Sequence, residues 1–151
     1  MLKGITLSAQ INYVTGNQIY DIWGGFFQSD GANPQYNQYN TLLDSWQQPG
    51  DETDVPKYVY YNKSGSNSTS TRFLYDGDYV RLRDVTLSYD IPANLATKLR
   101  MNSIRVYVRG TNLYTWTKDK DLPFDPDVSY GYGDLNLPVM KSMIGGITLG
   151  F

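Results

Sequence analysis

Regular alternation of apolar and polar residues is the feature that most constrains how this chain can fold. From residue 5 to residue 13 every second side chain is apolar, in the series Ile5, Leu7, Ala9, Ile11 and Tyr13. Thr, Ser, Gln and Asn stand between them, and a period of two is typical of a β-strand. Three later segments repeat the pattern. The chain is therefore predicted to be all-β, with strands near residues 5–14, 79–91, 103–115 and 141–151.

The connections between these strands are long, short and long. Residues 15–71 and 118–138 are predicted as loops, and only one short helical candidate, around residues 39–47, lies in the first of them. The short connection could form one or two helical turns at residues 93–100. Loops this long are uncommon in compact domains, but β-barrels of bacterial outer membranes have long extracellular loops and short periplasmic turns. The pattern favours four antiparallel strands from the C-terminal end of a transmembrane β-barrel, with Phe151 on the periplasmic side.

The second predicted strand changes phase along its length. From Val85 to Ile91 the apolar residues occupy odd-numbered positions, whereas upstream Val80 and Leu82 occupy even-numbered positions. The slip predicts a β-bulge near Arg83, or else the point at which the strand leaves the membrane.

Composition excludes several classes of function. The formal net charge is only -2 and no block of five or more like charges is present, which argues against a nucleic-acid-binding protein. The chain has no Cys and no His, so zinc fingers, disulfides, Cys nucleophiles and His-dependent triads are impossible. We therefore expect no enzyme activity, no catalytic residue, no cofactor and no metal ligand. A mean hydropathy of -0.46 is compatible with a barrel, because each membrane strand has only about ten residues of alternating polarity.

The last predicted strand ends with apolar residues at alternate positions, Ile147, Leu149 and the terminal aromatic residue Phe151. This pattern resembles the signal that the outer-membrane assembly machinery reads. A strand with an unpaired edge can pair with a template strand before the barrel closes. The alternative is an ordinary edge strand of a soluble sheet. Aromatic residues near the predicted strand ends also fit the girdles of a membrane barrel.

Candidate substrate contacts come from one strand face and from two tryptophans. Arg105, Tyr107 and Arg109 would face the barrel lumen if the residues between them face lipid. There they could bind substrate, or simply pack against other parts of the protein. Trp46 and Trp116 are further candidates, because aromatic rings stack on sugars. The five Asp residues between 119 and 134 could bind calcium, but their spacing is not that of an EF-hand, and a solvated loop is the simpler interpretation.

Several blocks of the sequence resemble the C-terminal barrel segment of SusC/RagA-type TonB-linked outer-membrane transporters of Bacteroidetes. The strongest are YVRLRDVTLSYDIP at residues 79–92 and IRVYVRGTNL at residues 104–113. The acidic-Pro-acidic motif at residues 125–127 and the ending at residues 145–151 are also similar to that family. So is the segment from Trp46 to Pro56. The resemblance extends over essentially the whole chain.

The resemblance implies a TonB-dependent receptor in the cell outer membrane that imports glycans, peptides or other nutrients. Its partners would be a SusD-like surface lipoprotein, membrane lipid, and the remaining barrel strands and plug domain. TonB would act through an N-terminal part that residues 1–151 do not include, and no signal peptide is recognisable at Met1. The alternative is a soluble β-sandwich that binds carbohydrate through Trp46, Trp116 and loop tyrosines.

Overall fold

The computed structural model describes residues 4–127, 132–133 and 137–151. The chain divides into two compact units. Unit 1 contains residues 1–16, 78–120 and 138–151, and unit 2 contains residues 17–77 and 121–137. Each unit has its own sheet.

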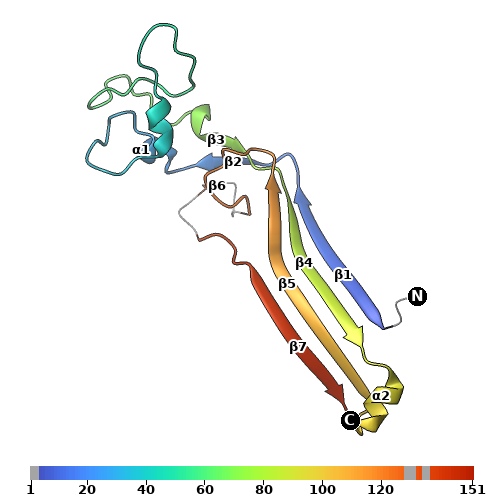
Figure 1. The fold of residues 1–151 in the computed structure, drawn as a ribbon. Helices are drawn as coiled ribbons and strands as arrows, with labels where there is room; N and C mark the ends of the chain where they lie inside the picture. The colour runs from blue at the N-terminus through green and yellow to red at the C-terminus, as the bar shows by residue number, and fades with distance from the viewer. Residues whose placement is uncertain (1–3, 128–131, 134–136) are drawn as a thin grey trace. The chain divides into compact units, whose positions relative to one another are not determined.

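Unit 1 is built on a four-stranded sheet in the order β1-β4-β5-β7 (Figure 1). Its strands are β1 (Ile5–Val14), β4 (Tyr79–Asp90), β5 (Ser103–Thr117) and β7 (Ser142–Gly150). All neighbouring strands are antiparallel. The prediction of four antiparallel strands is therefore confirmed.

A β-bulge at Arg83 explains the phase slip in the sequence. Gln10 of β1 pairs with Asp84, but the next residue, Ile11, pairs with Leu82, so Arg83 is the extra residue of β4. Directly paired residues of an antiparallel sheet lie on the same face. The bulge thus brings Leu82 onto the same face as the later apolar residues of β4, and it confirms the prediction near Arg83.

A short helix closes the connection between β4 and β5. Helix α2 (Ala93–Lys98) follows Pro92, whose fixed φ suits the start of a helix. Ala96 is fully buried and anchors the helix, and the amide of Met101 donates to the Ala96 carbonyl at 3.0 Å. This agrees with the one or two helical turns expected there.

Unit 2 contains more regular structure than the sequence predicted. A three-stranded sheet has the order β3-β2-β6, in which β2 pairs antiparallel with β3 and parallel with β6. The described elements are β2 (Gln18–Asp21), α1 (Gly24–Phe27), η1 (Asn40–Asp44), η2 (Thr71–Phe73), β3 (Leu74–Asp76) and β6 (Tyr132–Gly133). Only η1 coincides with the helical candidate near 39–47. The others have two to four residues, too short for a periodic pattern.

The interior of unit 2 is centred on two fully buried apolar side chains, Ile19 and Phe73. Gly24 and Gly77 allow this packing, because a Cβ on either would meet the ring of Phe73 or the side chain of Ile19. No helix in the described part of the chain is long and apolar enough to cross a membrane.

Candidate functional site

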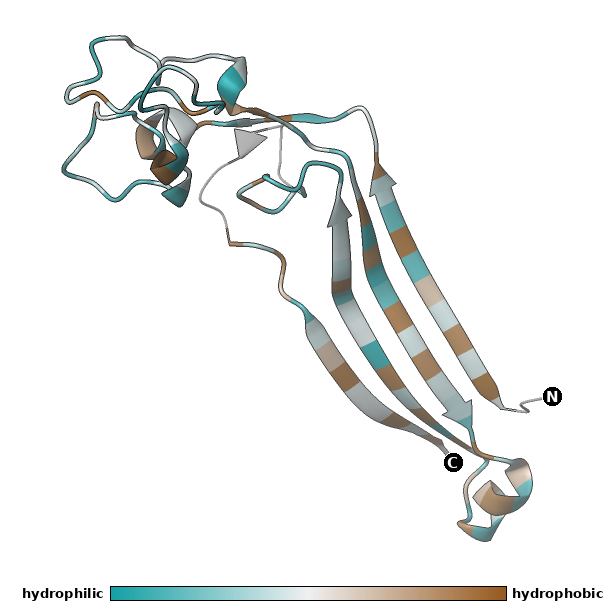
Figure 2. Cartoon of the chain, turned by 45° about the horizontal axis from the view of Figure 1, so that its top comes forward, coloured by the Kyte–Doolittle hydropathy of each residue, from teal (hydrophilic) through white to brown (hydrophobic). Residues whose placement is uncertain are grey.

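One face of the four-stranded sheet carries an exposed apolar surface, which we call the apolar face. Strand pairing places its residues in rows across the sheet, and Figure 2 shows the alternation of hydrophobic and hydrophilic residues along the strands. A typical row joins Leu7, Leu87, Val108 and Gly145. Leu7 is 68% exposed and Ile147 is 65% exposed, although both lie within paired strands. Large exposed apolar surfaces mark contact with a protein, a ligand or a membrane.

Aromatic residues stand at both ends of the apolar face. Tyr13, Val80 and Trp116 form one end row, and Tyr114 lies 4.5 Å from Trp116 between ring centroids. Tyr89 stands in the row of Ile5 at the other end. Tyr13 and Ile5 are eight residues apart, about 26 Å along the strand at roughly 3.3 Å per residue, which becomes about 20 Å of height at the tilt of about 40° that barrel strands have. The apolar band of a membrane barrel is about 25 Å tall and is flanked by aromatic girdles.

The opposite face, which we call the polar face, carries paired charges. Arg105 of β5 bonds to Asp90 of β4, with 2.6 Å between Nε and Oδ1, and its Nη2 donates to Oδ2 at 3.1 Å. Arg109 forms an ion pair with Asp84, in which its Nε donates to Oδ2. Tyr107 lies between the two arginines in sequence and covers Gly146 of β7. A Cβ at Gly146 would come 2.5 Å from the tyrosine ring.

A fully buried arginine is the member of the polar face that sequence reasoning missed. Arg81 donates from Nε to the Thr115 hydroxyl at 3.0 Å, and its guanidinium lies 5.4 Å from the ring centroid of Tyr79. In the sequence alone, the shift in alternation at Arg83 hid the fact that Arg81 belongs to the polar face. Once the bulge is counted, Arg81 falls on the polar face with its partner Thr115.

The structure brings some predicted site residues together and separates others. Arg105, Tyr107 and Arg109 share the polar face, as the alternation implied. Trp116 instead lies on the apolar face, so it cannot line one path with them. Trp46 lies in unit 2, where Lys57 approaches its ring at 5.5 Å.

The residues of the predicted insertion signal lie at the end of β7. Ile147 pairs with Val106 and Leu149 pairs with Ile104, which places both on the apolar face. Phe151 follows the strand and is 85% exposed. Their role in membrane insertion remains a prediction.

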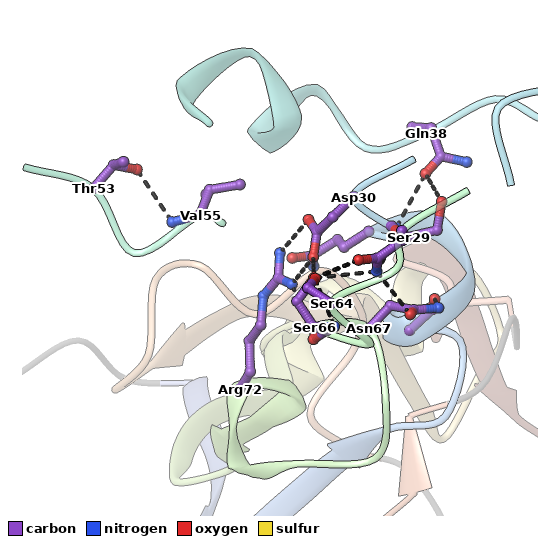
Figure 3. Close-up of polar contacts among 12 residues, drawn as sticks. Ser29, Asp30, Gln38, Thr53, Val55, Ser64, Ser66, Asn67 and Arg72 are labelled. Atoms are coloured by element: carbon purple, nitrogen blue, oxygen red, sulfur yellow. Dashed lines mark hydrogen bonds and ion pairs between the residues drawn. The ribbon is translucent and has the colours of Figure 1, made fainter. Parts of the chain in front are cut away.

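A buried polar cluster organises unit 2 (Figure 3). The carboxylate of Asp30 is fully buried and accepts hydrogen bonds from both terminal nitrogens of Arg72 and from the Ser66 hydroxyl. Asn62 is also buried, and its amide nitrogen lies 3.0 Å from the Ser29 carbonyl oxygen. These contacts join segments that are more than 30 residues apart in the sequence. The long predicted loop is therefore an ordered structure.

Asp21 is a second buried acid in unit 2. Its Oδ1 accepts the backbone N–H of Trp23 at 2.9 Å, while Oδ2 has no hydrogen bond to the described residues. Burial raises the pKa of Asp21 above its ordinary value of 3.8, and the backbone N–H groups of Trp23 and Gly24 offset part of the rise. Asp21 in turn contributes to the raised pKa of Tyr39, whose main cause is burial.

The raised pKa of Asp21 predicts a pH dependence of stability. The folded state binds the proton of the Asp21 carboxyl more tightly than the unfolded state does. The stabilisation that results is therefore complete below about pH 3.8, and it is lost as pH rises through the pKa that Asp21 has in the folded state. We expect the stability of the wild type, relative to Asp21→Asn, to rise as pH falls from 7 towards 4. Urea titrations of both proteins across this range measure the difference. A difference that stays constant with pH would show that Asp21 is not held in this environment.

The acidic residues between 119 and 134 do not form a recognisable metal site in the described structure. Among the residues described, no group of three or more acidic side chains is placed to hold a metal ion. Asp134 lies outside the described residues.

Comparison with known proteins gives a consistent result. The chain is 33% identical over 95 residues to TonB-dependent receptor P3 of Formosa agariphila, which covers 62% of this chain and 9% of that protein. It is 23% identical over 164 residues to TonB-dependent receptor P26 of the same organism, covering 99% of this chain and 16% of that protein. No family model matches the sequence.

Solved structures match the fold over 99% of the chain. A chain of the RagAB peptide importer in its closed-closed state has a TM-score of 0.82 and 32% sequence identity, and this protein spans 16% of that chain. A structure of the RagAB peptide transporter gives a TM-score of 0.83 and 31% identity. These relatives are receptors and transporters rather than enzymes. The chain is thus a homologue of the TonB-dependent receptors, and its fold is that of the C-terminal part of a RagA-type TonB-dependent β-barrel.

Proposed function

We propose that this chain forms part of the wall of an outer-membrane transporter that imports nutrients with energy supplied through TonB. The two-faced sheet carries this proposal. Its apolar face is exposed and has the aromatic borders of a lipid-facing surface, and its polar face has the paired charges of a barrel interior. The likeness to TonB-dependent receptors and to RagAB supports the same function.

The open edges of the sheet indicate what must complete it. In the described structure β1 and β7 are the outer strands, each paired on one side only. Unpaired backbone groups are costly inside a membrane, so further strands must pair with both edges. We infer that these strands, and a plug domain against the polar face, belong to the same transporter. TonB would contact a part of the transporter outside residues 1–151.

The alternative, a soluble β-sandwich that binds carbohydrate, agrees less well with the structure. The inner face of a sandwich is buried against a second sheet. In the described residues, large apolar side chains of the four-stranded sheet are exposed instead. The exposed apolar face favours a membrane strand.

Glycans and peptides are the cargo classes that we propose, and a SusD-like surface lipoprotein is the proposed partner. Arg105 and Arg109 are each paired with an aspartate, so their charges are largely neutralised. We propose that they hold β4 and β5 in register and line the interior. Tyr107 and Trp46 remain the candidates for direct substrate contact, and RagAB, a peptide importer, makes peptides the first cargo to test.

Deletion of the gene in its host tests this function. We expect the deletion strain to lose uptake of fluorescent oligopeptides or oligosaccharides, and the cloned gene to restore it. Collapse of the proton-motive force with an ionophore should also stop uptake, because TonB depends on that force. Unchanged uptake of every peptide and glycan tested would refute the proposed function.

A further inference from the structure

Unit 2 presents an exposed group of tyrosines flanked by lysines, which we call the tyrosine surface. It comprises Lys57, Tyr58, Tyr60, Tyr61 and Lys63. Tyr60 is 60% exposed and Tyr61 is 68% exposed, and their ring centroids are 4.3 Å apart. Exposed aromatic groups of this kind mark sites of interaction more often than isolated exposed residues do.

The backbone beneath the tyrosine surface is held in an unusual conformation. Tyr61 has a φ of 63° and Asn62 has a φ of 33°, in the left-handed region that is uncommon for residues other than glycine. A bulky residue in this region costs free energy and persists only where the surrounding structure enforces it. Strain of this kind at an exposed aromatic residue points to a function for the side chain that it displays.

The surrounding structure enforces the conformation through two strong attachments. The amides of Val59 and Tyr61 donate to the carbonyl groups of Asp30 and Gly31 at 2.9 and 2.8 Å. Gly31 has a φ of 99°, and a Cβ there would collide with the Val59 carbonyl. The buried ion pair from Arg72 fixes Asp30 in turn. The tyrosines are therefore displayed on a rigid support, which lowers the entropy lost when a partner binds.

The electrostatics of the tyrosine surface favour an acidic partner. No Asp or Glu occurs in the sequence between Asp54 and Asp76, although the whole chain has a net charge of -2. Within this stretch Arg72 is neutralised by Asp30. Lys57 and Lys63 make no ion pair with any residue in the described part of the chain. Lys57 lies over the ring of Trp46, 5.5 Å from its centroid, and keeps its positive charge there, so both lysines can attract carboxylates of a partner.

We propose that the tyrosine surface binds an acidic face of the transporter's surface lipoprotein. This inference rests on the proposed function, which gives the transporter such a partner, and on the loop pattern of the sequence, which predicts that the long loops lie outside the cell. A protein fits better than a sugar, because the rings of Tyr60 and Tyr61 meet at 66° and form no flat platform for stacking. Tyrosine supplies large contact area at low entropy cost and is enriched in protein interfaces.

Carbodiimide cross-linking of the complete complex in outer membranes tests the contact, because this reagent joins lysine amines only to carboxylates that touch them. We expect mass spectrometry to find Lys57 or Lys63 joined to an Asp or Glu of the lipoprotein.

The double variant Tyr60→Ser/Tyr61→Ser should weaken binding of the purified lipoprotein by about thirtyfold, as for residues at the centre of an interface. Lys57→Glu/Lys63→Glu should weaken it by about tenfold and reduce its salt dependence.

Tyr36→Ser is the matched control, because Tyr36 is an exposed tyrosine of the same unit without flanking lysines. It should leave binding unchanged. If the lipoprotein copurifies but Lys57 and Lys63 cross-link only within their own polypeptide, the tyrosine surface is covered by the transporter itself and the inference is wrong. If binding survives both double variants, the inference is also wrong, while the proposed function stands. Failure of any lipoprotein to copurify would contradict the partner in the proposed function as well.

Discussion

Replacing Leu7 by arginine is expected to lower the free energy of unfolding of the membrane-inserted protein by about 2–4 kcal/mol. Leu7 lies on the apolar face, one row from the middle of the band between the two aromatic ends. An arginine there must place its charge in hydrocarbon or distort the bilayer to reach water. Denaturant unfolding of the complete protein in lipid vesicles measures the loss.

Ser8→Arg is the control for this prediction. Ser8 is the next residue of the same strand but pairs with Thr86 on the polar face. Substitutions towards a barrel interior are tolerated much better than those towards lipid, so Ser8→Arg should cost far less than Leu7→Arg. Equal losses for the two variants would contradict the assignment of the two faces.

Replacing Asp30 by alanine is expected to destabilise the polar cluster of unit 2 by about 3–5 kcal/mol. The change leaves the Arg72 guanidinium, whose side chain is only 18% exposed, without its carboxylate partner. The Ser66 hydroxyl loses its acceptor as well. Hydrogen exchange of the Val59 and Tyr61 amides, which bond to residues 30 and 31, should accelerate about a hundredfold or more, because about 1.4 kcal/mol corresponds to tenfold.

A second substitution separates loss of the ion pair from general damage. Adding Arg72→Met to Asp30→Ala removes the unpaired charge, so the double variant should exchange more slowly than Asp30→Ala alone. Lys63→Ala, an exposed residue nearby, should have little effect. If the double variant loses as much stability as the sum of the two single variants, the ion pair does not hold this cluster together.

The strands of unit 1 could be predicted from the sequence because strands with one apolar and one polar face obey a simple rule. Each strand has nine or more residues, and most of its length alternates, which is enough for a period of two to stand out from chance. The bulge was visible for the same reason, since Arg83 interrupts an otherwise regular alternation. Pairing partners could not be predicted, because alternation fixes the face of a residue but not its neighbour across the sheet.

The structure of unit 2 could not be predicted, because contacts between residues far apart in the sequence hold it together. Asp30 and Arg72 are 42 residues apart, and neither belongs to a periodic pattern. Its strands and helices are too short to bias the local sequence, so the region had the composition of a loop. Trp116 was ambiguous for another reason, since an aromatic residue at a strand end suits both a membrane girdle and a sugar site. The strand register places it with Tyr13 and Val80 on the apolar face.

The most direct test of the central claim is quenching of Trp116 fluorescence by brominated lipids. In the complete protein, reconstituted in vesicles and retaining Trp116 as the sole tryptophan, we predict strong quenching by lipids brominated near the headgroup. Trp46, retained alone, should be quenched by aqueous iodide and not by these lipids, because it lies in the segment 15–71 that the sequence predicts as an extracellular loop. Quenching of Trp116 by iodide and not by brominated lipid would contradict a lipid-facing sheet.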